Sequence, residues 1–309
     1  MRRGDVTEDD GTWVGLSLDL RDRLRPGLCV YSAGNRLLIS QGDAPVLLAV
    51  IDPGYAGVDF WRTDAYRSIV PPLRADEARA LAGSTQRWAH RFARFLADAP
   101  DGPLHEGRWL LSPEGRLRGR DAGVPLAEHW GELLVEGHPD GYIDWFVHSG
   151  SWEVLPSRPM PDAGDSRVKA YRKQARDGTL PPVLTWWISG LDCHLILDGH
   201  ARLAAAIAES VEPALLELRR VTPRDELSAR VDEAVGAYTS EIARFAGLRA
   251  TRSPSVPDGA ALMGPVLARR LRALDTAGRP TWSWPLPGGA ARWDRIVEEV
   301  TNSRDWPPS

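Results

Sequence analysis

The chain has 309 residues, of which 43% are hydrophobic and 26% are charged, so it has the composition of a folded protein and the length for two or three domains. Its formal net charge of -4 gives no overall attraction to nucleic acid, and such binding would need a local basic patch. The two cysteines, Cys29 and Cys193, lie far apart in the sequence, which argues against a disulfide framework or a cysteine-based metal cluster.

No segment resembles a signal peptide or a membrane span. Residues 1–11 are polar and acidic, and the longest aliphatic run, residues 46–51, has the length of a strand. We therefore expect a cytoplasmic protein with no membrane partner.

Residues 1–149 are predicted to form a mixed α/β domain. Residues 28–31 and 36–40 flank a turn-like Ser-Ala-Gly-Asn cluster, which predicts a hairpin, and residues 46–51 predict a buried strand. Apolar residues recur at helical spacing over residues 75–98, which predicts one helix there.

Residues 150–221 are predicted to form a second domain in which helices and strands alternate. Asp165 or Ser166 is a suitable helix cap, and the Pro181-Pro182 pair cannot continue that helix. The expected order is a strand (152–155), a helix (165–176), two strands (183–188 and 193–197), a helix that begins directly after Gly199, and a strand (214–218).

Residues 222–309 are predicted to form a mostly helical C-terminal region. Thr222 and Pro223 mark a helix start, and a long apolar stripe follows from Leu227 to Phe245. Further helices are expected over residues 260–274 and 290–300. We expect the tryptophans of the proline-rich loop at 282–287 to hold that loop against this helical region.

The run Asp198-Gly199-His200-Ala201-Arg202 carries the chemistry that the sequence suggests. It stands where a strand passes into a helix, and the first N–H groups of a helix have no internal partners and favour an anion. Gly199 has no Cβ to keep a phosphate away, and Arg202, one turn into the helix, is placed to contact the same phosphate. The alternative is a purely structural turn that is capped by Asp198.

The surroundings of this run resemble the ParB/sulfiredoxin-like superfamily. A helix containing Val-Lys-Ala-Tyr, a Gly-Thr-Leu-Pro-Pro-Val-Leu segment at 178–184 and the Leu-Asp-Gly-His-Ala-Arg-Leu-Ala-Ala-Ala run at 197–206 follow the order of that family's helix, G-x-x-x-P-P-V/I and "DGHHR" signatures. The resemblance covers roughly residues 151–218. It implies that Asp198, Gly199, His200, Ala201 and Arg202 bind the phosphates of a nucleotide such as ATP, ADP or CTP, together with Mg²⁺.

This chain also departs from the family. His200 occupies the position of the catalytic cysteine of sulfiredoxin, so sulfinic acid reduction is not expected, and Ala201 replaces the second histidine of the signature. Serine-kinase-like members use a glutamate near the first strand as a base, and Glu153 is the candidate at that place. His200 and Glu153 are therefore the candidate catalytic residues.

A basic stripe is the second feature that could bind phosphate. Lys169, Arg172, Lys173 and Arg176 recur at helical spacing on one side of the predicted helix. Lys169 and Arg172 are candidate nucleotide contacts, while the stripe as a whole could follow a nucleic-acid backbone. The alternative is a solvated helix face.

Together these observations predict an α/β (α+β) protein in which a central ParB/sulfiredoxin-like domain lies between a mixed α/β domain and a helical region. The leading functional hypothesis is a nucleotide-binding protein that acts as a small-molecule kinase or a nucleotide hydrolase. The alternatives are a non-catalytic regulatory or interaction protein and a DNA-binding ParB-like protein, although the net charge does not favour nucleic acid as a partner.

Overall fold

The computed structural model describes residues 1–52, 57–113, 134–135, 137–145, 154–222, 224–251, 258–277, 281–301 and 306. The chain divides into two compact units, one formed by residues 1–220 with 281–309 and the other by residues 221–280. This division differs from the three domains expected from the sequence: the predicted boundary at 149/150 lies inside the first unit, and residues 281–309 belong to that unit and not to a helical region.

The first unit contains a seven-stranded sheet, sheet A, whose strand order is β1-β2-β7-β12-β10-β11-β9. β10 is antiparallel to β11 and parallel to β12, and β12 is antiparallel to β7. The sheet therefore joins strands from both sides of the expected 149/150 boundary. Its strands are β1 (Arg2–Thr7), β2 (Trp13–Leu20), β7 (Gly107–Pro113), β9 (Val154–Pro156), β10 (Val183–Ile188), β11 (Cys193–Asp198) and β12 (Leu215–Arg220).

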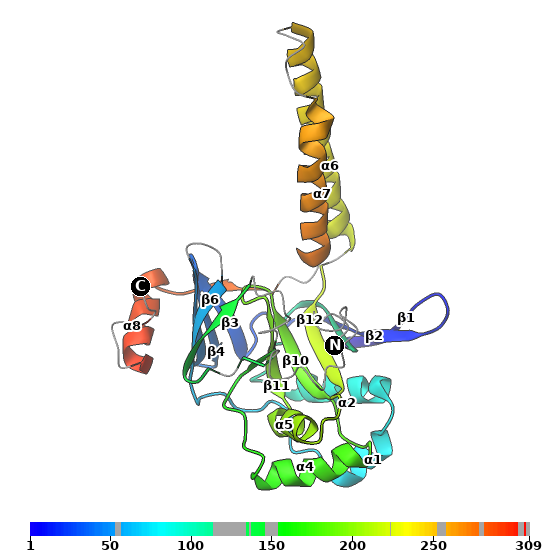
Figure 1. Ribbon diagram of the computed structural model, residues 1–309, viewed down its shortest axis with the longest axis vertical. Helices are drawn as coiled ribbons and strands as arrows, with labels where there is room; N and C mark the ends of the chain where they lie inside the picture. The colour runs from blue at the N-terminus through cyan, green and yellow to red at the C-terminus, as the bar shows by residue number, and fades with distance from the viewer. Residues whose placement is uncertain are drawn as a thin grey trace. The chain divides into compact units, whose positions relative to one another are not determined.

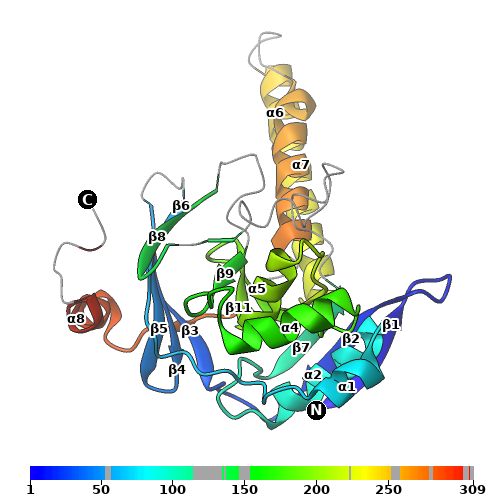
Figure 2. The same cartoon turned by 60° about the horizontal axis from the view of Figure 1, so that its bottom comes forward.

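The elements expected after residue 150 occur in the expected order. The helix α4 (Ser166–Arg176) follows β9, and the carboxylate of Asp165 caps it by accepting from the N–H groups of Arg167 and Val168. The helix α5 (His200–Ala208) begins directly after Gly199, between β11 and β12. α4 and α5 pack beside one another (Figure 2).

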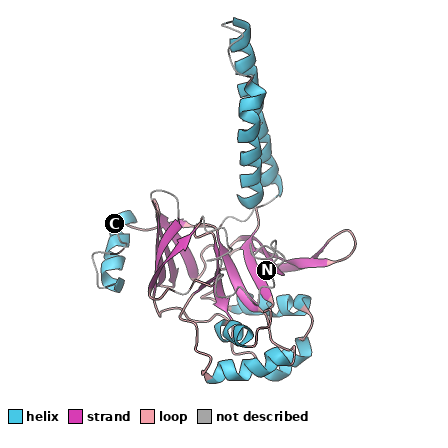
Figure 3. Cartoon of the chain, viewed as in Figure 1, coloured by secondary structure: helices cyan, strands magenta, loops and turns pink. Residues whose placement is uncertain are grey.

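A second sheet, sheet B, has the order β13-β3-β4-β5-β6-β8. The hairpin predicted near residue 34 is confirmed as the antiparallel pair β3–β4, and the buried strand predicted at 46–51 is part of β5. The strands are β3 (Leu28–Ala33), β4 (Arg36–Gln41), β5 (Ala44–Ile51), β6 (Gly57–Arg62), β8 (Asp140–Asp144) and β13 (Trp284–Pro285). Figure 3 shows the strands of both sheets in one colour.

The single helix expected over residues 75–98 is two helices, α1 (Ala75–Leu81) and α2 (Thr85–Asp98). Gly83 lies between them with a φ of +71°, a conformation that ends a helix and favours glycine. Ser84 then caps α2 by accepting from the N–H of Arg87 at 3.3 Å. The apolar period continues across the break, so periodicity alone did not reveal it.

Two apolar clusters stabilise the first unit. The larger one joins both sheets to α2 and includes Trp186 and Leu195 from sheet A, Leu47 and Phe60 from sheet B, and Phe92. The smaller one lies between sheet B and the C-terminal helix α8 (Gly289–Thr301), which Figure 1 shows beside β3 and β4.

The proline-rich loop also belongs to the first unit. Trp284 lies in β13, where it pairs in parallel with Tyr31 of β3, and Thr281 donates to the carbonyl of Trp187 at 2.9 Å. Trp284 also packs in the apolar cluster that contains Trp293 of α8, so the expected contact with the last predicted helix is present, whereas the pairing with sheet B was not expected. A loop that extends a sheet by backbone pairing leaves little trace in its own sequence.

The second unit is a pair of helices, α6 (Arg224–Thr251) and α7 (Gly259–Ala277), which pack against each other. Both lie where the sequence predicts helices. Among the described residues, no helix combines the length and the apolar character needed to cross a membrane.

We expect Trp293→Ala to destabilise the first unit by about 3–5 kcal/mol, because this side chain of α8 is 2% exposed and its indole N–H donates to the carbonyl of Leu37. Tryptophan fluorescence during urea unfolding measures this unit selectively, because residues 221–280 contain no tryptophan. Trp282→Ala, at a side chain that is 50% exposed, is the control and should cost about 1 kcal/mol or less. Equal effects of the two variants would contradict the placement of α8.

Candidate functional site

The junction between β11 and α5 has the geometry of an anion site. The first backbone bond of α5 runs from the N–H of Leu203 to the carbonyl of Gly199 at 2.8 Å, and no described side chain caps the helix. The N–H groups of the first turn, from His200 to Arg202, therefore have no partner within the helix. The positive end of the helix dipole lies at the same place.

Gly199 is required at this junction for a structural reason. Its φ is +107°, which side chains rarely adopt, and an added Cβ would lie 2.9 Å from Nη2 of Arg202 and 3.1 Å from Cα of Val183. The expected role of Gly199 was to let a phosphate approach. The structure instead shows that the chain's own atoms occupy the space beside it.

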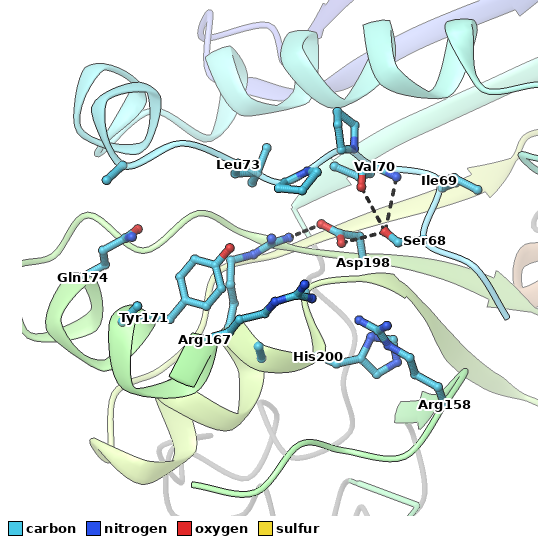
Figure 4. A pocket seen from close by; sticks show the side chains of 17 residues that line it. Ser68, Ile69, Val70, Leu73, Arg158, Arg167, Tyr171, Gln174, Asp198 and His200 are labelled. Atoms are coloured by element: carbon cyan, nitrogen blue, oxygen red, sulfur yellow. Dashed lines mark hydrogen bonds and ion pairs between the residues drawn. The ribbon is translucent and has the colours of Figure 1, made fainter. Parts of the chain in front are cut away.

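A pocket of about 740 Å³ opens at the start of α5 (Figure 4). A volume of this size is within the range of small-molecule sites. Its lining residues come from four parts of the chain: 68–73 with Ala75, then Arg158, then Arg167, Ala170, Tyr171 and Gln174 of α4, and finally 198–202.

Arg202 is part of the framework of this pocket. The residue is 3% exposed, and its Nη2 donates to Oδ2 of Asp198 at 2.6 Å and to the carbonyl of Pro182 at 2.9 Å. The sequence suggested an arginine that is free to reach a phosphate or lies on a solvated face. In the structure it is instead committed to the turn that precedes the helix and to the entry of β10.

The segment 66–73, which precedes α1, forms the wall of the pocket that sequence reasoning missed. The hydroxyl of Tyr66 donates to the carbonyl of Leu197 at 2.6 Å, and the hydroxyl of Ser68 donates to Oδ1 of Asp198 at 3.0 Å. Burial holds the pKa of Tyr66 well above its usual range, so the phenol remains a donor. These contacts join residues about 130 positions apart in sequence, and nothing local in residues 66–73 signals them.

His200 is 1% exposed and neutral. Burial, reinforced by the charges of Arg158 and Arg202, holds its pKa well below its usual range. Its Nε2 lies 3.3 Å from the hydroxyl of Ser157, and its Nδ1 has no hydrogen-bond partner among the described residues. A neutral imidazole of lowered pKa is a weak proton acceptor, which limits its value as a general base.

Arg158 and Arg167 supply the available positive charge. Figure 4 shows their side chains directed toward one another beside His200, one from the loop after β9 and the other from α4. Neither forms an ion pair with any residue of the described ranges. With Arg202, three arginines line the pocket against one carboxylate, that of Asp198, among the residues that the structure describes, so the site favours an anion.

The basic stripe of α4 lies away from this pocket. Lys169 and Arg172 are absent from the pocket lining, although both were candidate nucleotide contacts. Arg172 and Arg176 instead donate to Oε1 of Glu209 at 2.5 and 2.8 Å, which ties α4 to the end of α5. These hydrogen bonds hold the pKa of Glu209 below its usual value.

Of the other site residues predicted from the sequence, one group lines the pocket and one residue lies outside the described part of the chain. Asp198, Gly199, His200, Ala201 and Arg202 all line the pocket, as their spacing suggests. Glu153, the other candidate catalytic residue, lies outside the described residues. Arg167 could have been found from the sequence, since it precedes the inward-facing Tyr171 by one helical turn.

No protein-family model, curated protein or solved structure matches this chain.

We expect Arg202→Ala to lower the free energy of unfolding by about 3 kcal/mol or more, because it leaves the largely buried Asp198 carboxylate without its cation. Arg158→Ala, which removes a pocket arginine without breaking an ion pair among described residues, should change it by about 0.5 kcal/mol. The double variant Asp198→Asn with Arg202→Met, which removes both charges, should cost less than Arg202→Ala. Urea denaturation of the three proteins checks this, and a neutral effect of Arg202→Ala would show that the pair is not structural.

The buried histidines make stability fall in mild acid. His200 and His105 bind fewer protons in the folded than in the unfolded state, because burial lowers the pKa of both imidazoles, that of His105 to about 4. The stability that depends on these neutral histidines is therefore fully present above pH about 6.5, the pKa of histidine in the unfolded chain. Below that pH the free energy of unfolding falls, by about 1.4 kcal/mol per pH unit for each proton.

The variant His200→Gln should reduce the slope of the free energy of unfolding against pH between pH 6.5 and 5, by about the amount that one proton contributes. Urea denaturation at pH 7.5, 6.5, 5.8 and 5.0 measures the slopes. Equal slopes for wild type and His200→Gln would show that His200 is not held neutral.

Proposed function

We propose that the pocket at the start of α5 binds the phosphate groups of a nucleotide, ATP, ADP or CTP, and that residues 154–220 are a ParB/sulfiredoxin-like nucleotide-binding domain. One observation carries the proposal: the uncapped N–H groups at the start of α5 lie in the same pocket as the side chains of Arg158 and Arg167. The order β9-α4-β10-β11-α5-β12 supports the family assignment, because it follows the order of the signatures in the sequence.

The phosphate contacts in this proposal differ from those that the motif suggests. Arg158 and Arg167 contact the phosphate, while Arg202 and Asp198 hold the turn that presents the N–H groups. Mg²⁺ would arrive with the phosphates, since no group of three His, Cys, Asp or Glu side chains in the described part of the chain is arranged to hold a metal.

Binding without chemistry is the second candidate function. Asp198, the one carboxylate among the described residues of the pocket lining, is engaged by Arg202 and Ser68, and His200 is a weak base because its pKa is lowered. These features favour a regulatory nucleotide site over a kinase or hydrolase. Release of inorganic phosphate from bound ATP or CTP would favour the enzyme instead.

DNA binding receives less support. Two of the four basic side chains of the α4 stripe are paired with Glu209, which leaves Lys169 and Lys173 to meet a nucleic-acid backbone. Tight duplex binding that weakens steeply with salt would favour this function.

Arg167→Ala should weaken nucleotide binding about ten- to hundredfold, because it removes a charge-assisted contact of about 1.5–3 kcal/mol. Arg158→Ala should have an effect of the same order. Lys169→Ala, also on α4 but outside the pocket lining, is the matched control and should leave the affinity within about threefold. Calorimetric titrations with ATP, ADP and CTP in the presence of Mg²⁺ provide the affinities. Wild-type protein that binds none of them, or equal affinities for Arg167→Ala and Lys169→Ala, would contradict the proposal.

A further inference from the structure

The first half of α7 carries apolar residues all round the helix. Its residues 259–268 read Gly-Ala-Ala-Leu-Met-Gly-Pro-Val-Leu-Ala, with no charged side chain over nearly three turns. A helix that is apolar all round is normally buried on all sides, whereas a helix with a free side carries polar residues there. The sequence of α7 therefore predicts more cover than one neighbouring helix can supply.

Within the second unit, α6 covers only one side of this segment. Figure 1 shows α6 and α7 side by side, and a Cβ added to Gly259 would lie 2.7 Å from Cβ of Phe245, so the start of α7 is level with the last turns of α6. Leu267 is half-buried. Leu262 and Val266, one turn apart on the same side of α7, are 48% and 42% exposed. These two residues form an exposed apolar pair.

Charges of opposite sign stand at the two ends of the apolar segment. Asp258 precedes it and is exposed, and arginines at positions 269, 270 and 272 follow it in the sequence. If a second copy of α7 packs antiparallel about the level of residue 264, Leu262 of one copy lies level with Val266 of the other. Asp258 then lies level with position 270 of the other copy. The segment is therefore complementary to itself both in apolar character and in charge.

We infer that the exposed apolar pair, Leu262 and Val266, is the surface through which two copies of this chain form a twofold dimer with antiparallel α7 helices. A twofold contact uses the same patch on both copies, so one contact covers both exposed pairs. A parallel arrangement is unfavourable, because it would bring the arginines of the two copies together and their like charges repel. The inference concerns the second unit alone and is independent of the proposed nucleotide site.

The contact is small, so the dimer should be weak. Residues 258–270 of the two copies overlap over about 18 Å at about 1.5 Å per residue. A contact of this length is at the low end of specific interfaces, and we expect a dissociation constant of about 1–100 µM. Burial of four exposed apolar side chains stabilises the dimer.

Sedimentation velocity of the full chain, at concentrations from about 1 to about 500 µM, measures the monomer–dimer equilibrium. Val266→Glu should weaken dimerisation about tenfold or more, because it places a carboxylate in an apolar contact. Val235→Glu is the matched control: the substitution is the same and the side chain is also 42% exposed, but it lies on α6. This control should leave the dissociation constant within about threefold. Far-UV circular dichroism compares the helix content of the variants with that of wild type.

A second variant keeps the inference testable if Val266→Glu lowers the helix content. Leu262→Gln, a change that helices tolerate, should weaken dimerisation about fivefold or more. Wild-type protein that stays monomeric at about 500 µM would overturn the inference, because the exposed pair would then be left to the first unit or to a different protein. A dimer that Leu262→Gln does not weaken, or that Val266→Glu and Val235→Glu weaken equally, would also overturn it.

Discussion

The ion pair between Arg202 and Asp198 is the interaction on which the site depends. It joins the first turn of α5 to the end of β11, and the second bond of Arg202, to the carbonyl of Pro182, joins both to the entry of β10. Asp198 also accepts from Ser68, so the same carboxylate fixes the segment that forms the opposite wall of the pocket. A buried pair with these additional hydrogen bonds is costly to break on one side only, which makes it suited to holding a turn in one conformation.

In this arrangement one set of residues shapes the turn and another set supplies the positive charge. The motif Asp198-Gly199-His200-Ala201-Arg202 shapes the turn and presents the N–H groups of α5, while the available charge comes from outside the motif, from Arg158 and Arg167. The N-terminal part of the chain is not an independent domain beside the site. It supplies β7, which pairs with β12, and the segment 66–73, which closes the pocket.

Sequence reasoning succeeded where the determinants are local. The caps, prolines and apolar periods between residues 154 and 220 are close in sequence to the elements they define, and the strand-to-helix junction at Gly199 followed from them. It failed where the partner is distant. Nothing near Arg202 indicates whether its guanidinium meets a ligand or Asp198 and Pro182, and nothing near residues 66–73 or α8 indicates which sheet or loop they contact.

The most direct test is a crystal structure of the protein with ADP and Mg²⁺. The account predicts a phosphate group within hydrogen-bond distance of the first-turn N–H groups of α5, between Arg158 and Arg167, with Arg202 still bound to Asp198. A phosphate bound by Arg202 after it has left Asp198, or a nucleotide bound elsewhere on the chain, would contradict it.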